Sequence, residues 1–145
     1  QRLVATSRMI RGDAKVVCFT AVPLRELPQL RSFRSHLARW DFEPYGICIR
    51  RDWLQNRGGS PVCYGDNALW ESLGNELRPF FQVRTSTSRR SGRVADWSIE
   101  QEWRHLGDVD LRELPTDAGL VFVPSQEAAE QVAMISRWPV TVVGS

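Results

Sequence analysis

The chain has 145 residues, the length of one ordinary domain, and its 42% hydrophobic and 25% charged residues are the proportions of a globular protein. No apolar run approaches the length of a membrane span and no signal peptide is visible, which excludes a membrane partner. The formal net charge of +2 is too small to indicate nucleic-acid binding by itself.

The first third of the chain predicts two strands and a helix. Residues 15–20 form a continuous β-favouring run, which indicates a buried strand. Pro28 suits the first position of a helix, and apolar residues then recur at helical spacing, which predicts a helix over 28–39. A second strand is expected over 45–50, followed by a helical turn over 51–57 that two glycines close.

The middle of the chain predicts short alternating elements. Residues 61–64 favour a strand, and Asp66 stands in a turn or at a helix N-cap. Leucines four residues apart predict a helix over 68–77, and an extended piece follows over 79–83. Residues 85–95 are polar, basic and low in complexity, which indicates a flexible loop, with an exposed hairpin as the alternative.

The C-terminal part predicts a strand over 119–123, an N-cap at Ser125, a helix to residue 136 and a last strand over 139–143. The whole order indicates an α+β fold: a single domain over 1–145 with a mixed, mostly antiparallel sheet and short flanking helices. The residues expected in its core are Val17, Phe19, Ile47, Ile49, Val62, Trp103, Val121 and Phe122.

A charged stretch beginning at Glu100 is the most informative part of the sequence. If residues 96–104 form a strand, Trp103 lies on one face, and Glu100, Glu102 and Arg104 lie on the other. Trp103 is large and apolar, so its face is expected to turn toward the core. Two carboxylates beside a guanidinium suit a site that stabilises positive charge. The same spacing also suits a solvated charge ladder on an exposed sheet face.

The three cysteines, Cys18, Cys48 and Cys63, are far apart and form no C-x-x-C pair. The two histidines are not at ligand spacing to them, so no metal site is expected. Cys18 and Cys48 stand in apolar surroundings typical of core positions, and the number of cysteines is odd, which favours reduced thiols and a cytoplasmic location.

Four short motifs occur in the order known from the AbiGi-type abortive-infection families of bacteria. Residues 16–24 resemble their V-C-F-T-x-x-P-L segment, and residues 45–54 are similar to their Y-G-I-G-F…W strand. Residues 58–64 resemble G-G-x-P-V-x-Y, and residues 100–104 resemble E-R-E-W-R. The resemblance spans most of the chain and implies a component of phage resistance.

The layout of residues 102–106 followed by 120–123 also resembles the end of the DarT-like ADP-ribosyltransferases. That resemblance implies that Glu102 is the catalytic acid and that NAD is the substrate. Glu102→Gln is then expected to remove activity while the fold survives. Those enzymes carry an earlier strand that helps to hold NAD. The chain starts at Gln1, after the place of that strand, so we expect the native N-terminal strand to be missing.

An ADP-ribosyltransferase needs further groups around its catalytic carboxylate. An aromatic ring must stack on the nicotinamide, and Tyr45 or Tyr64 is the candidate. A cation must meet the pyrophosphate, and the candidates are Arg50, its neighbour Arg51 and Arg104, the last also supporting the site with Glu100.

Three functions remain open from the sequence. The first is an ADP-ribosyltransferase-like domain of an anti-phage or toxin–antitoxin system. The second is a non-catalytic antitoxin or sensor domain that binds a cognate partner protein or nucleic acid. The third is a nuclease or nucleic-acid-binding domain, which lacks a clustered set of metal-binding residues. The surroundings of Glu102 separate the first from the second, since an enzyme needs this carboxylate in a concave pocket.

Overall fold

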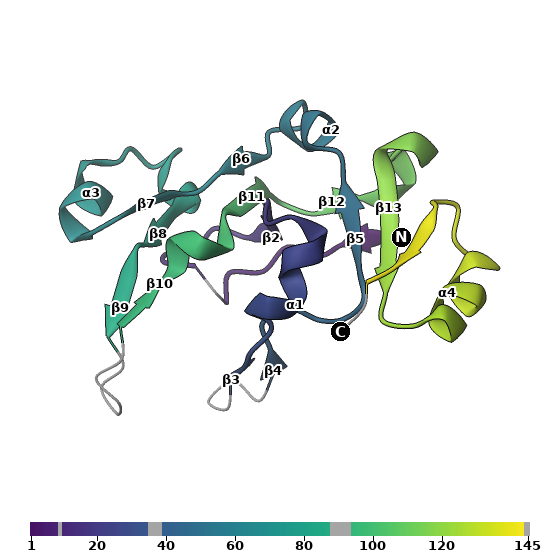
Figure 1. Ribbon diagram of the computed structural model, residues 1–145. Helices are drawn as coiled ribbons and strands as arrows, with labels where there is room; N and C mark the ends of the chain where they lie inside the picture. The colour runs from purple at the N-terminus through teal and green to yellow at the C-terminus, as the bar shows by residue number, and fades with distance from the viewer. Residues whose placement is uncertain (9, 35–38, 88–93, 144–145) are drawn as a thin grey trace. The chain divides into compact units, whose positions relative to one another are not determined.

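A computed structural model of the protein describes residues 1–8, 10–34, 39–87 and 94–143 (Figure 1). It has the α+β fold that the sequence predicts, with short helices and several small, mostly antiparallel sheets in place of one mixed sheet. The chain forms two compact units. Unit 1 contains Gln1–Ala21 and Leu54–Leu111, and unit 2 contains Val22–Trp53 and Arg112–Ser145. The single domain over 1–145 stays a prediction.

Unit 1 is built around a three-stranded antiparallel sheet with the order β2-β11-β6. Its strands are β2 (Val16–Thr20), β11 (Glu102–Leu106) and β6 (Ser60–Pro61). The predicted strand over 15–20 is therefore confirmed. In the register of this sheet, Arg104 on the central strand stands opposite Cys18 on one side and Ser60 on the other.

Three strand pairs and three short helices complete unit 1. The pairs are β1 (Arg2–Leu3) with β12 (Val109–Asp110), β7 (Cys63–Gly65) with β8 (Phe81–Val83), and β9 (Thr85–Thr87) with β10 (Val94–Asp96). The helices are α3 (Asn67–Ser72) and the 3-10 turns η2 (Arg78–Phe80) and η3 (Trp97–Glu100). Asp66 caps α3 as predicted, because its carboxylate accepts a hydrogen bond from the Leu69 N–H at 3.0 Å.

Unit 2 holds a second three-stranded sheet with the order β14-β13-β5. Its strands are β5 (Gly46–Ile49), β13 (Gly119–Val123) and β14 (Val140–Val142). β5 runs antiparallel to β13, whereas β14 runs parallel to it. A parallel pair needs a crossover connection, and α4 (Gln126–Ala133) supplies it. Ser125 caps α4 as predicted, since its hydroxyl accepts from the Ala128 N–H at 3.2 Å.

The remaining elements of the chain are short. They are η1 (Leu24–Glu26), α1 (Leu27–Leu30), β3 (Phe33–Arg34), β4 (Arg39–Trp40), α2 (Arg51–Gln55), η4 (Leu111–Glu113) and η5 (Thr116–Ala118). α2 is the predicted helical turn, and Gly58 follows it with a φ of 90°, a left-handed conformation that favours glycine.

Two predicted helices are wrong in extent. The helix over 28–39 ends at Leu30, because Arg31 is extended and β3 then pairs with β4. Phe33 stands opposite Trp40 in that pair, so their spacing reflects cross-strand pairing and not helical periodicity. The helix over 68–77 likewise ends at Ser72.

The described part of the predicted loop over 85–95 consists of strands, and its flexibility stays a prediction. Residues 85–87 and 94–95 belong to β9 and β10. These strands pair antiparallel, as in the exposed hairpin that the sequence leaves as the alternative. Residues 88–93 lie outside the described residues.

The buried apolar residues fall into both units. Val17 and Val62 are buried as predicted, whereas the other six expected core residues are only half-buried. Small three-stranded sheets enclose less surface than one larger sheet would, which explains the difference. In the part of the chain that the structure describes, no helix is long and apolar enough to cross a membrane.

Candidate functional site

The backbone around Glu100 differs from the uninterrupted strand that the sequence predicts. Residues 97–100 form the 3-10 turn η3, and Gln101 has a φ of 45°, in the left-handed region. β11 begins only at Glu102. Glu100 and Glu102 are therefore not alternate residues of one strand, and the predicted row of two carboxylates is wrong. Glu100 is held near the sheet by its own carbonyl, which accepts from the Thr20 hydroxyl at 2.6 Å.

Arg104 is the centre of the site and is only 1% exposed. Its Nη1 donates to the carbonyl oxygens of Pro79 at 2.8 Å and Phe81 at 2.7 Å. Its Nη2 donates to the Gln82 side chain at 2.7 Å. The remaining donors of the guanidinium go to Glu102, so all five N–H groups have acceptors.

Glu102 neutralises this buried guanidinium with both of its carboxylate oxygens. Oε1 accepts from Arg104 Nε at 2.8 Å and Oε2 from Nη2 at 3.1 Å. The Glu102 side chain is 13% exposed, compared with 1% for that of Arg104. The prediction that the Glu102–Arg104 face turns outward is therefore wrong, and Trp103 on the other face is half-buried. The carbonyls of η2 and β8 make burial of the guanidinium favourable, since a buried charge needs a partner for each donor.

Tyr64 is the one predicted ligand-binding residue that contacts this site. Its hydroxyl accepts from the Glu102 backbone N–H at 2.8 Å. Burial raises the pKa of Tyr64, and the carboxylates of Glu102 and Glu100 raise it further, whereas the N–H bond and Arg104 lower it. The structure thus brings Tyr64, Glu102 and Arg104 together, with Glu100 close enough to act electrostatically.

Cys18 joins this cluster from β2, where it stands opposite Arg104. Burial raises the pKa of its thiol to about 12, the Glu102 carboxylate adds to this rise, and Arg104 opposes it. The residue nevertheless keeps an exposed surface. Sequence reasoning missed Cys18 as a member of the site, and only the pairing of β2 with β11 reveals it.

Tyr45 and Arg50, the other two predicted ligand-binding residues, belong to unit 2 and are described there. Tyr45 is 56% exposed. The Arg50 guanidinium is hydrogen-bonded to the Asp52 carboxylate, with Nε at 3.1 Å from Oδ1, and lies 3.8 Å from Asp117. The bond to Asp52 raises the pKa of Arg50. Its charge is thus already balanced by local carboxylates.

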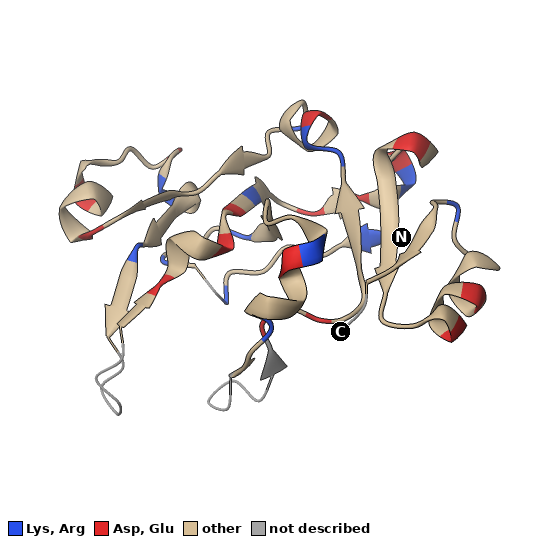
Figure 2. Cartoon of the chain, in the orientation of Figure 1, with Lys and Arg blue, Asp and Glu red and all other residues tan. Residues whose placement is uncertain are grey.

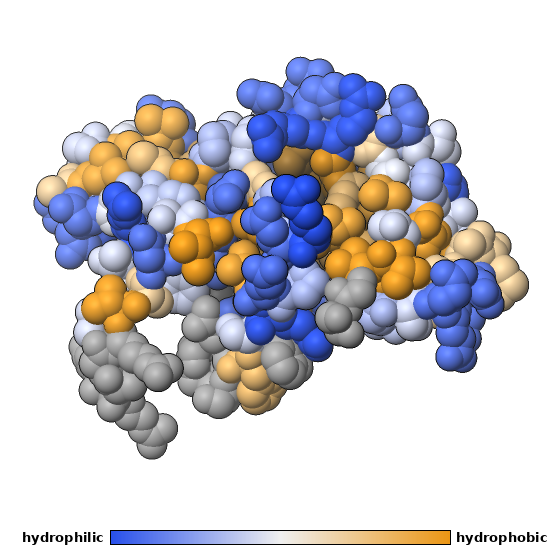
Figure 3. All heavy atoms as spheres, viewed as in Figure 1, coloured by the Kyte–Doolittle hydropathy of each residue, from blue (hydrophilic) through white to orange (hydrophobic). Residues whose placement is uncertain are grey.

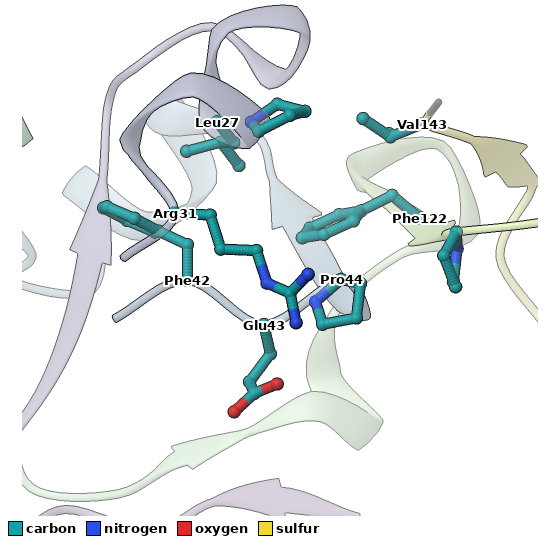
Figure 4. Close-up of a pocket in the computed structure, with 9 residues that line it drawn as sticks. Leu27, Arg31, Phe42, Glu43, Pro44, Phe122 and Val143 are labelled. Atoms are coloured by element: carbon teal, nitrogen blue, oxygen red, sulfur yellow. The ribbon is translucent and has the colours of Figure 1, made fainter. Parts of the chain in front are cut away.

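Unit 2 contains a pocket of about 280 Å³ that the sequence did not indicate. Its walls are mostly apolar, and Figure 4 shows Leu27 and the Phe122 ring on opposite sides of it. The Arg31 side chain extends across it toward Pro44. In Figure 3, apolar surface gathers over the neighbouring ends of β13 and β14. In the sequence, Pro28 and Pro44 indicate only where a helix starts and stops, which conceals their role as pocket walls.

No family model, curated protein or solved structure shows a significant match to this chain. All three cysteines are free thiols. Among residues 1–8, 10–34, 39–87 and 94–143, no three side chains of His, Cys, Asp or Glu come together in a way that could hold a metal ion.

Proposed function

We propose that this chain is a non-catalytic binding domain and that Glu102 is a structural residue in it. The observation that supports this is the two-point ion pair of Glu102 with Arg104, a side chain that is 1% exposed. In line with the motifs that resemble abortive-infection families, the binding serves a phage-defence or toxin–antitoxin system. The partner is a cognate protein.

The chemistry of the pair argues against a catalytic carboxylate. A glutamate that stabilises an oxocarbenium-like state must present an oxygen to the ribose. Both oxygens of Glu102 are bonded to Arg104, at 2.8 and 3.1 Å. Turning either oxygen toward a substrate would leave a buried guanidinium donor without its acceptor. Breaking a buried ion pair in this way costs about 3–5 kcal/mol.

The test compares Glu102→Gln with Glu71→Gln, a control at an exposed position of α3 in the same unit. The proposal predicts that Glu102→Gln lowers the free energy of unfolding by about 3 kcal/mol or more, because an amide cannot neutralise Arg104. The control should stay within about 0.5 kcal/mol of the wild type. Urea unfolding followed by tryptophan fluorescence measures both.

ADP-ribosyl transfer from NAD is the second candidate function. The specific observation in its favour is that Tyr64, an aromatic residue, lies at hydrogen-bond distance from Glu102, with its hydroxyl 2.8 Å from the Glu102 N–H. Incubation with labelled NAD and DNA, RNA or protein tests it. If the wild type transfers label and a folded Glu102→Gln variant does not, the chain is an ADP-ribosyltransferase and the binding proposal is wrong.

A further inference from the structure

The edge strand β14 pairs with β13 through alternate residues only. Val121 donates its N–H to the Pro139 carbonyl at 2.9 Å, and in this parallel register the odd-numbered residues of β14 face β13. The N–H and C=O groups of Val140 and Val142 therefore point away from β13. Among the strands that the structure describes, β13 is the only neighbour of β14, so these backbone groups form an open edge.

A groove of about 540 Å³ lies between this edge and α4. One face of α4 lines it with Ala129, Glu130 and Ala133, and β14 lines it with Val140 and Val142. The two alanines are one helical turn apart, and their small side chains leave room beside the strand. Val142 on this edge strand is 39% exposed.

The charge of α4 indicates the chemistry of the occupant. The helix carries Glu127 and Glu130 and no cationic residue, as the red segments of α4 show in Figure 2. Glu130 lines the groove directly. A second copy of the chain would bring the same carboxylates to the edge, where like charges repel. A segment with lysine or arginine would instead meet an opposite charge.

We propose that β14 is a docking edge at which an extended, basic segment of a partner protein adds a strand. The segment bonds to the open backbone groups of Val140 and Val142, places small apolar side chains over Ala129 and Ala133, and directs a cation to Glu130. This inference rests on the proposed binding function and adds the surface and the chemical class of the partner.

The experiment measures fluorescence anisotropy of a labelled short peptide against the full chain. Valine and lysine occupy every second position of this peptide, so that in an extended chain both share the face that turns toward α4. Val142→Pro removes an N–H that β13 does not use, and proline is tolerated at such edge positions. Val142→Thr keeps that N–H and is the matched control. We expect peptide binding to the wild type and to Val142→Thr, and a loss of at least about tenfold in affinity with Val142→Pro. Glu130→Lys should reverse the preference toward a peptide with glutamate in place of lysine.

If Val142→Pro fails to fold, the same peptide with N-methyl groups on its strand-pairing residues tests the wild-type protein, and it should not bind. The inference is overturned if the lysine peptide does not bind the wild-type protein, or if it binds Val142→Pro as tightly as the wild type. It is likewise overturned if the N-methylated peptide binds the wild type as tightly as the unmodified peptide does. It is also overturned if sedimentation shows that the edge pairs two copies of the chain. None of these outcomes depends on Glu102, so a failure here leaves the structural role of Glu102 to its own test.

Discussion

Glu102 and Arg104 lie two residues apart on β11 and face the same side, where the carboxylate holds the guanidinium through two bonds of 2.8 and 3.1 Å. Alternate residues of a strand share a face, so the pair forms within one strand and needs no turn. The groups that allow the guanidinium to be buried lie outside β11, because the Pro79 and Phe81 carbonyls accept the hydrogen bonds from Nη1. The pair thus links β11 to the segment that runs from η2 into β8.

Tyr64→Phe is expected to destabilise the protein by about 1–2 kcal/mol. The Tyr64 hydroxyl accepts the Glu102 backbone N–H at 2.8 Å, and phenylalanine leaves that donor without its acceptor. Tyr45→Phe is the matched control, since Tyr45 is 56% exposed and its substitution should have almost no effect. Chemical unfolding of both variants measures the difference, and equal stabilities would contradict the role of this hydrogen bond.

Stability is expected to fall as the pH rises from about 9 to about 12. The thiol of Cys18 ionises near 9.0 in the unfolded chain, whereas its pKa in the folded protein is about 12. The unfolded state therefore loses its proton first, and each step upward in pH between these values favours unfolding. Cys48 and Tyr64 shift in the same direction and contribute to the slope.

The contribution of Cys18 is isolated by Cys18→Ala. The fall in unfolding free energy between pH 9 and pH 12 should be shallower in this variant than in the wild type, because one of the raised groups is gone. Urea unfolding at a series of pH values measures both slopes. Parallel curves would show that the Cys18 thiol ionises alike in the folded and unfolded states.

Gly46→Ala is expected to destabilise unit 2 by about 1–3 kcal/mol. A Cβ at this position would lie closer to Cζ of the Phe122 ring on the neighbouring strand than real contacts allow. The ring must then move, and it is also a wall of the apolar pocket. Phe122→Leu should relieve the clash, so a double-mutant cycle in which the two substitutions add without coupling would contradict this account.

The sequence predicts those elements whose signals are local. The run of apolar residues over 119–123 forms β13, and the side chains of Asp66 and Ser125 cap α3 and α4 where the pattern predicts. These features depend on residues within a few positions of one another, so propensity and capping chemistry are sufficient to find them.

The candidate site could be predicted only in part. The sequence draws attention to Glu102 and Arg104, but it predicts that their face of the sheet is exposed, whereas Arg104 is buried. The acceptors that allow Arg104 to be buried are the carbonyls of Pro79 and Phe81, which are 25 and 23 residues away in the chain. Every residue has a backbone carbonyl, so residue identity does not show which carbonyls will accept from Arg104. The alternation of side chains along the strand by itself therefore favours Trp103 as the inward residue.

The most direct test of the account is a double-mutant cycle between Glu102 and Arg104, with Glu102→Gln, Arg104→Met and the double variant compared by urea unfolding. If the carboxylate is there to neutralise the buried guanidinium, each single substitution costs about 3 kcal/mol or more, and the double variant costs clearly less than their sum. A stability of Glu102→Gln within about 0.5 kcal/mol of the wild type, together with loss of label transfer from NAD, would contradict it and make Glu102 a catalytic residue.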